Sequence, residues 1–320
     1  MQPAINKLKT IIKSIKTTTN NQTMTKPVIA VFGTNGALGK PTLDALTSST
    51  FSSKVSLPIR AITRDPSKYT SNDKIKYYKA DTADIDSFKD ALTGVNVLIN
   101  LSGMADMQHY DAPLDALLKF AKSTVQLYIP SHFGTDLDVI DLPGFLGFKP
   151  AHFAKARAAG LKTVEVVTSA FFNPGSFLYE FIPGLDNAES TAVIRGDKNS
   201  KFDVSYVGDI GKAVAAIVTF GDLGALPEKV RISSDQVTLD QVLDNYEKNH
   251  PGVKVAREYT SKEATYKKAH ELYDAGFQFQ DFLFYFQYFV SEGYALSSKN
   301  EKELINPGES LFKWTKFGSI

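Results

Sequence analysis

The stretch VIAVFGTNGALG, residues Val28–Gly39, joins an apolar run to three glycines in the spacing G-x-x-G-x-x-G. The apolar run is rich in β-branched side chains and ends at a glycine, which is typical of a buried parallel strand. Residues 40–47 continue at helical spacing, with Leu43 and Leu46 on one face. The segment therefore predicts a strand, a glycine loop and a helix in that order.

A glycine loop between a strand and a helix is the context in which such loops bind the pyrophosphate of a dinucleotide. Glycine permits the turn, lets the backbone approach the phosphates and lets the helix pack closely on the strand. The helix N-terminus adds free amides and a favourable dipole. The alternative is a tight turn without a ligand. The residues expected to hold the dinucleotide are Gly33, Thr34, Asn35, Gly36, Ala37, Leu38 and Gly39.

Strands and helices alternate along the first half of the chain. This rhythm predicts an α/β fold with a doubly wound parallel sheet, the Rossmann architecture, because right-handed crossovers place helices on both faces. Beyond about residue 170 the alternation breaks, which indicates a smaller α/β C-terminal lobe for the substrate. Further strands are expected at 55–63, 75–79, 95–101, 125–129 and 163–168, and helices at 84–92, 113–122 and 151–159.

The expected organisation has three parts. Residues 1–26 form a basic extension that is expected to be flexible, and residues 27–172 form the NAD(P)-binding domain. Residues 173–320 form mainly the substrate lobe, with some segments that return to the first domain. Helical patterns at 213–220 and 239–249 belong to this last part.

The extension is basic and amphipathic, with apolar residues at helical spacing between lysines. No acidic residue precedes Asp44, and no arginine precedes Arg60. A start of this kind is compatible with a mitochondrial presequence, although such presequences usually carry arginine. One alternative is that Met24 is a second start immediately before the folded domain, and another is that the extension is a disordered tail of a cytoplasmic protein.

The end of the second predicted strand bears on which dinucleotide binds. An acidic side chain there would hydrogen-bond the ribose of NAD, whereas an arginine suits the additional 2′-phosphate of NADP. The strand ends at Arg64, and Lys68 supplies a second cation four residues on. We therefore expect NADPH as the cofactor. Asp65 beside Arg64 leaves NAD open, and an ordinary surface arginine is the alternative for Arg64.

Composition narrows the classes of function. The chain has 320 residues, of which 43% are hydrophobic and 22% charged, so a folded core is expected. A net charge of +1 gives no reason to expect nucleic acid, and no apolar run is long enough for a membrane span. The absence of cysteine, of metal-ligand spacing and of a G-x-S-x-G motif argues against thiol, metal and hydrolase chemistry. The expected partner is a small-molecule substrate. The sequence is compatible with either a monomer or a homodimer.

Several stretches of the chain carry the patterns of a known family. They are residues 29–39, 60–68, 78–87, 127–134 and 149–173, with looser matches at 192–216 and 230–246. The most specific is Pro130-Ser131-His132-Phe133-Gly134, where family members usually read P-S-E-F-G and this chain has a histidine. On these patterns the sequence resembles the NmrA-like and isoflavone-reductase-like family of atypical short-chain dehydrogenases, over nearly all of 28–320.

The resemblance implies roles for several further positions. Asp81 and Thr82 match the segment that flanks the adenine, and Ser102 and Gly103 follow the fourth strand and would line the cofactor. The remaining positions lie near the expected nicotinamide, where Phe133 borders the pocket and Phe172 and Asn173 follow the sixth strand. These further cofactor contacts are Ser131, Phe133, Lys149, Phe172 and Asn173.

The Tyr-x-x-x-Lys pair of typical short-chain dehydrogenases is missing, because no tyrosine has a lysine four residues later. The resemblance implies that a lysine takes this role, eleven residues before the glycine that ends the helix ahead of the sixth strand. Counting back from Gly160 reaches Lys149, our candidate general acid/base. Apolar walls and a cationic nicotinamide would lower its pKa toward working pH. The alternatives are an exposed lysine before Pro150 and a role for Lys155 instead.

Two histidines and one aromatic segment are candidates for substrate contacts. His152 lies three residues after Lys149, where it would tune that lysine or touch the substrate, unless it is a solvated surface residue. His132 would face the nicotinamide or serve a structural role. The aromatic segment 277–289 is expected mainly to pack the second lobe or a dimer surface, with one or two rings in the pocket.

Two functions of different classes follow from these patterns. The first is an NADPH-dependent reductase that transfers hydride to a small, aromatic or conjugated substrate, with a lysine as general acid/base. The second is a non-catalytic NADP(H)-binding redox sensor that acts through a protein partner. Lys149 favours the enzyme, and an open pocket at the nicotinamide would do so too, whereas a filled pocket would favour the sensor. An NAD-linked epimerase is disfavoured by the missing tyrosine–lysine pair.

Overall fold

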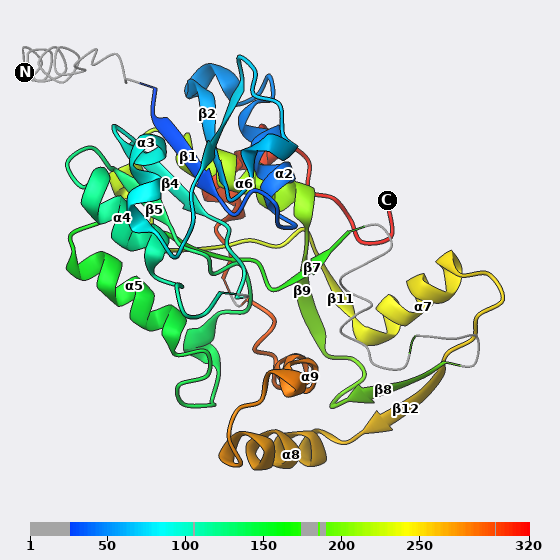
Figure 1. Cartoon of the computed structure of the whole chain (residues 1–320). Coiled ribbons are helices and arrows are strands. Elements are labelled where there is room, and N and C mark those ends of the chain that lie inside the picture. Colours follow the sequence, from blue (N-terminus) through cyan, green and yellow to red (C-terminus); the bar gives the residue numbers. More distant parts are fainter. Residues whose placement is uncertain (1–25, 105, 174–184, 186–189, 298) are drawn as a thin grey trace, which may run out of the picture.

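The computed structural model describes residues 26–104, 106–173, 185, 190–297 and 299–320 (Figure 1). The predicted basic extension therefore lies, except for Lys26, outside the described residues. Five parallel strands form the central sheet in the order β3-β2-β1-β4-β5. They are β1 (Val28–Phe32), β2 (Ser56–Thr63), β3 (Ile75–Lys79), β4 (Val97–Asn100) and β5 (Leu127–Ile129).

This sheet confirms the predicted α/β class, and each of its strands begins and ends within two residues of its predicted range. Strand β1 lies at the centre because its apolar residues are buried on both faces. Its Ala30–Phe32 segment pairs with residues 60–62 of β2 and with residues 98–100 of β4. The carboxyl ends of these three strands therefore lie level with one another.

Helices cover both faces of the sheet, as the doubly wound architecture requires (Figure 1). Ile29 and Val31 of β1 share a buried cluster with the helices of one face, and Ala30 and Phe32 share another with the helices of the opposite face. The residues divide in this way because successive side chains of a strand point to opposite faces of the sheet. The first face carries α2 (Gly39–Leu46) and α6 (Val207–Val218), and the second carries α3 (Lys89–Leu92), α4 (Ala112–Phe120) and α5 (Phe148–Ala158).

The sixth predicted strand continues the sheet beyond β5. A parallel bridge joins Tyr128 to Thr163, and the chain then enters β6 (Glu165–Val167). Strand β6 pairs in parallel with β10 (Lys229–Arg231), which comes from the second half of the chain. Val230 of β10 and Trp314 near the C-terminus also belong to the core cluster on the α2 and α6 face.

The remaining elements form a second group with a hydrophobic cluster of its own. Its aromatic helix α9 (Phe282–Glu292) is buried along most of its length, as expected for the aromatic segment. A capping box of Thr238 and Gln241 begins α7 (Leu239–Asn249) at its predicted position. The strands are β7 (Ala170–Phe172), β8 (Thr191–Arg195), β9 (Lys201–Tyr206), β11 (Asp235–Thr238) and β12 (Ala256–Thr260), and the helices are α7, α8 (Lys262–Asp274) and α9. The short helix α10 (Lys302–Ile305) returns to the first group, where its Ile305 joins the core cluster of α2 and α6.

Two helices begin three or more residues earlier than the sequence pattern predicts. Helix α5 begins at Phe148, so Lys149 lies inside its first turn and Pro150 is its third residue. Proline is tolerated there because the first amides of a helix have no partner within it. Helix α6 begins at Val207 and includes the glycine-containing run 208–211 that the helical pattern leaves out.

Gly211 of α6 allows close packing on α2. A Cβ atom on Gly211 would lie 2.5 Å from the backbone carbonyl carbon of Pro41. Asp209, on the same turn, is fully buried and accepts hydrogen bonds from Ser234 Oγ and from the backbone N–H of Thr315. The second half of the chain thus supports the helix that follows the glycine loop.

We predict that Gly211→Ala lowers the free energy of unfolding by about 1–3 kcal/mol, because the methyl group forces α6 and α2 apart. In an open helix the same change would stabilise the protein. Chemical denaturation measures the effect. Gly221→Ala is the matched control, since a Cβ there has no atom within 4 Å. A Gly211→Ala protein as stable as wild type would contradict the packing argument.

Candidate cofactor and substrate site

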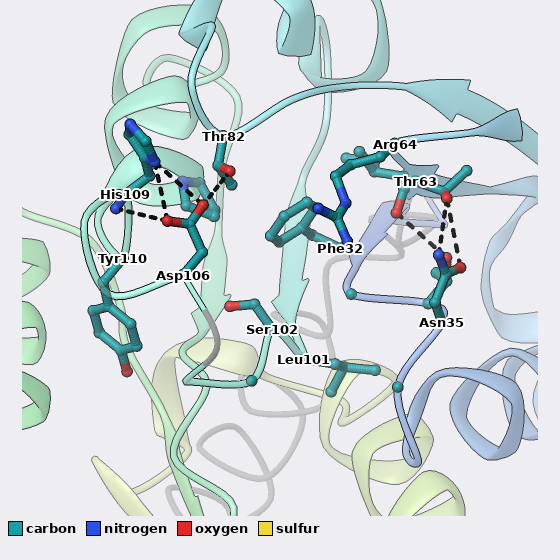
Figure 2. Close-up of a pocket in the computed structure, with 16 residues that line it drawn as sticks. Phe32, Asn35, Thr63, Arg64, Thr82, Leu101, Ser102, Asp106, His109 and Tyr110 are labelled. Carbon is teal, nitrogen blue, oxygen red and sulfur yellow. Dashed lines mark hydrogen bonds and ion pairs between the residues drawn. The ribbon is translucent and has the colours of Figure 1, made fainter.

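A cavity of about 420 Å³ opens at the carboxyl ends of β1, β2 and β4 (Figure 2). From β1 the chain adds strands β2 and β3 on one side and then β4 and β5 on the other side. The crevice between β1 and β4, where the order switches sides, is where open α/β sheets bind ligands. The walls come from the three loops that follow β1, β2 and β4, from the loop after β3 and from one later segment. The lining residues include Gly33, Thr34, Asn35, Gly36, Thr63, Arg64, Thr82, Leu101, Ser102, Gly103, Asp106, His109 and Tyr110.

The glycine loop lies directly against the end of β4. Gly33 has a φ of 84°, and a Cβ atom on it would lie 2.6 Å from the carbonyl carbon of Leu101 and the amide nitrogen of Ser102. A Cβ on Gly39 would lie 2.0 Å from the carbonyl oxygen of Thr34. Both positions therefore require glycine. A Cβ atom on Gly36 would lie no closer than 3.5 Å to any neighbouring atom, so the absence of a side chain leaves space above the loop.

Side-chain hydrogen bonds join the loop to the end of β2. Asn35 Nδ2 donates to Thr63 Oγ1 at 3.3 Å, and Tyr69 Oη donates to Asn35 Oδ1 at 2.7 Å. Thr34 Oγ1 donates to the carbonyl oxygen of Ile62 at 3.3 Å. These bonds place Arg64, the next residue after Thr63, at the wall of the cavity (Figure 2).

Arg64 and Asp65 have different environments. Arg64 is exposed and lines the cavity, and no described residue forms a hydrogen bond or ion pair with its guanidinium. The Asp65 carboxylate accepts from the Ser67 backbone N–H and hydroxyl and lies 3.6 Å from Lys68 Nζ. The Ser67 hydroxyl in particular holds the pKa of Asp65 below its usual value. Neither Asp65 nor Lys68 lines the cavity, so Arg64 is the charged side chain of this β2 segment that faces it.

The opposite wall holds Thr82 together with residues that the sequence patterns do not reveal. Thr82 Oγ1 donates to Asp106 Oδ2 at 2.6 Å, and His109 Nδ1 lies 3.0 Å from Asp106 Oδ1 (Figure 2). Tyr110 completes this wall. Asp81 lies beside the cavity rather than in it, and its carboxylate accepts the backbone N–H of Ala83.

A second cavity of about 270 Å³ has mainly apolar walls. Gly103 lines the first cavity and Met104 lines the second, so the two cavities meet at this loop. Three aromatic side chains of α9 form one wall, which is one more than the sequence analysis expects. The lining residues include Met104, His132, Phe133, Leu137, Phe145, Leu146, Lys149, Phe171, Phe282, Phe286 and Phe289.

Lys149 and His132 supply the polar groups of this second cavity. Lys149 Nζ donates to the carbonyl oxygen of His132 at 3.0 Å, and burial lowers the pKa of Lys149 from its ordinary 10.5 to about 8. His132 is buried, with Nε2 3.0 Å from the carbonyl oxygen of Thr135. Burial, reinforced by the charge of Lys149, lowers the pKa of His132 to about 3. His132 is therefore neutral at working pH, and its Nε2–H donates to Thr135.

The loop of His132 is held in an unusual conformation. Phe133 has a φ of 32°, a region that side chains other than glycine rarely adopt, and it lines the second cavity. The hydroxyl of Ser131 donates to the carbonyl oxygen of Ser102, which joins this loop to the wall of the first cavity. Buried Asp136 pairs with Lys229 and Arg231 of β10 and holds the far end of the loop.

His152 is not the solvated surface residue that the sequence leaves open. It is 2% exposed, because α5 packs this side chain between β5 and the beginning of α4. Its Nε2 lies 2.8 Å from Tyr128 Oη, and its Nδ1 lies 2.5 Å from Asp111 Oδ1. It lines neither cavity, and Lys155 pairs with Asp111 and Asp115 on the outer side.

The structure brings Phe172 and Asn173 to neither cavity. Phe172 packs in the second core against Tyr206 and Phe317, because alternation along β7 directs Phe171 to the second cavity instead. Asn173 lies in a separate surface groove that Ala37 also lines. Of the remaining loop residues, Leu38 is buried in the core and Gly39 begins α2.

Comparison with known proteins identifies the family. The pattern that defines the NmrA-like family matches residues 25–303, and the chain belongs to this family. No curated protein matches the chain.

Solved structures share the fold at low sequence identity. An isoflavone reductase is 20% identical with a TM-score of 0.65, and the match covers 88% of this chain and 94% of that one. A leucoanthocyanidin reductase–NADPH complex from Vitis vinifera is 16% identical with a TM-score of 0.64, covering 85% and 89%. The Citrobacter sp. triphenylmethane reductase with NADP(H) is 17% identical with a TM-score of 0.60, covering 91% and 97%.

Among the described residues, no group of three or more histidine, aspartate or glutamate side chains is placed to hold a metal ion. Among the helices of the described segments, none combines the length and apolarity that crossing a membrane requires.

The lowered pKa of Lys149 predicts how stability depends on pH. The pKa of Lys149 is lower in the folded chain than in the unfolded chain, so burial of its ammonium lowers the free energy of unfolding. This destabilisation is complete below about pH 8 and disappears as pH rises toward 10.5. Lys149→Met removes this destabilisation. The difference in unfolding free energy between Lys149→Met and wild type should therefore shift in favour of wild type between pH 8 and 10.5. Denaturation at several pH values measures this difference, and a constant difference would contradict the burial argument.

Proposed function

We propose that the protein is an NADPH-dependent reductase that transfers hydride to a small aromatic or conjugated substrate, with Lys149 as the general acid. The observation that carries this proposal is the position of Lys149 Nζ, a proton donor inside an apolar cavity that meets the cavity at the end of the sheet. The solved relatives that are named reductases and hold NADPH or NADP(H) support the assignment.

The first cavity has the features that a dinucleotide phosphate needs. The glycine loop presents backbone next to the beginning of α2, where a pyrophosphate is stabilised by amides and by the helix dipole. Arg64 faces the cavity without a described partner, which suits a 2′-phosphate. Ser102 and Gly103 lead to the second cavity, so the nicotinamide would lie near Phe133.

NADPH bound in the first cavity would supply the hydride that an electrophilic carbon of the substrate needs. Lys149 then donates its proton to the oxygen on which negative charge develops. Its hydrogen bond to the carbonyl oxygen of His132 fixes Nζ in position, and neutral His132 does not compete as a cation. The aromatic side chains of α9 exclude water and stack with a flat substrate.

The second cavity also bears on the choice between enzyme and sensor. Its volume of about 270 Å³ is space for a small molecule beside the expected nicotinamide, whereas a sensor has no need of such a space. The open cavity therefore favours the reductase over a redox sensor.

The role of Arg64 predicts a specific loss of NADPH affinity. We expect Arg64→Ala to raise the Kd for NADPH by about tenfold or more, the effect of removing a hydrogen-bonded charge. The Kd for NADH should change little, because NADH lacks the 2′-phosphate, and it serves as the internal control. Both constants can be measured by fluorescence titration. Equal losses for the two cofactors would show that Arg64 does not read the 2′-phosphate.

The role of Lys149 predicts the pH profile of turnover. With aromatic and conjugated carbonyl compounds as test substrates, kcat/KM should fall as pH rises through about 8, because the ammonium of Lys149 in the free enzyme is the acid. Lys149→Met should lower kcat roughly 10²–10⁴-fold. Lys122→Met removes an exposed lysine outside both cavities and should retain activity. A Lys149→Met enzyme with wild-type kcat would exclude the proposed role.

A further inference from the structure

A series of buried polar side chains runs beneath the junction of the two cavities. Asn100 at the end of β4, Tyr128 in β5 and His152 in α5 are each no more than 2% exposed. None of the three lines either cavity, and none has a part in the proposed chemistry. Buried polar groups of this kind are costly unless each is hydrogen-bonded, so their partners indicate what they hold in place.

The inner end of the series holds the loop between the cavities. The backbone N–H and the hydroxyl of Ser102 both donate to Asn100 Oδ1, at 3.0 and 2.7 Å. Asn100 Nδ2 in turn donates to Tyr128 Oη at 3.2 Å. Because the amide of Asn100 is used on both sides, the loop Leu101–Gly103 has one favoured position.

The outer end of the series holds helix α5. Tyr128 Oη lies 2.8 Å from His152 Nε2, and His152 Nδ1 lies 2.5 Å from Asp111 Oδ1. Burial lowers the pKa of His152, which favours the neutral ring. A neutral ring with its proton on Nδ1 donates to Asp111 and accepts from the Tyr128 hydroxyl. Each donor atom from Ser102 to His152 then has at least one acceptor.

The same helix carries Lys149, and this closes a ring of contacts. Lys149 Nζ donates to the carbonyl oxygen of His132, and the adjacent Ser131 donates through its hydroxyl to the carbonyl oxygen of Ser102. The loop Leu101–Gly103 is thus joined to α5 by two sets of hydrogen bonds, one through His152 and one through Lys149. A shift of either the loop or the helix would break bonds in both sets.

We propose that His152 is a positioning residue that holds the loop Leu101–Gly103 and the helix of Lys149 in a fixed relation across the junction of the two cavities. It acts through Tyr128 and touches neither cofactor nor substrate. The inference rests on the proposed function, because it assigns the first cavity to NADPH and the second to the substrate.

Two substitutions at His152 separate its two hydrogen bonds. The amide of His152→Gln reaches the place of Nε2 and can accept from Tyr128, whereas the amide of His152→Asn reaches the place of Nδ1 and can donate only to Asp111. We expect His152→Asn and Tyr128→Phe each to raise the Kd for NADPH by about tenfold, the effect of one buried hydrogen bond. His152→Gln should bind NADPH within about threefold of wild type. The double variant His152→Asn/Tyr128→Phe should be no weaker than the weaker single variant.

Tyr285→Phe is the matched control. It removes a buried tyrosine hydroxyl that has no hydrogen-bond partner among the described residues, and Tyr285 lines neither cavity. NADPH Kd, kcat and the thermal unfolding midpoint are measured for every variant. A role in folding alone would lower the unfolding midpoint of His152→Asn while its Kd for NADPH stayed at the wild-type value.

The outcomes separate the inference from the proposed function. The positioning role is supported if wild type binds NADPH, if His152→Asn and Tyr128→Phe bind it more weakly, and if His152→Gln binds it about as tightly as wild type. The positioning role alone is overturned if His152→Asn and Tyr128→Phe bind NADPH with the wild-type Kd. It is also overturned if His152→Gln binds NADPH as weakly as His152→Asn does. A wild-type protein that does not bind NADPH overturns the proposed cofactor and this inference together.

Discussion

The contact between the glycine loop and the end of β4 is the constraint on which the rest of the site depends. No side chain fits at Gly33, because Leu101 and Ser102 occupy the space that a Cβ would need. This close approach sets the distance between the ends of β1 and β4 and so shapes the first cavity. It also fixes the backbone of Leu101–Gly103, which leads directly to the second cavity.

Support for this contact comes from parts of the chain far from it in sequence. Helix α6 packs on α2 at Gly211, and Asp209 in the same helix joins it to Thr315 near the C-terminus. On the other side, Asn100 and Tyr128 hold the loop from beneath. The loop therefore has a rigid base, which is what a site needs if a cofactor and a proton donor are to meet at one place.

The second cavity shows how an apolar environment changes ordinary side chains. The sequence singles out Lys149 only by its spacing from Gly160, and it is burial in the folded protein that lowers the pKa of this lysine to about 8. The same environment keeps His132 neutral. The aromatic side chains of α9 form part of that environment, although they lie more than 130 residues further along the chain. The chemistry of Lys149 thus depends on a segment that no local pattern connects to it.

Local pattern determined the central sheet, the position of the glycine loop and the wall residue Arg64. Strands β1 and β3 and helix α7 have their predicted bounds because the spacing of apolar residues and the capping residues act within a few residues of one another. Only the tertiary structure decided that Asp106 and His109 line the first cavity, that His152 is buried, and that Phe172 faces away from both cavities. The reason is physical: these outcomes depend on which distant segments pack against a residue, and no periodicity along the chain records that packing.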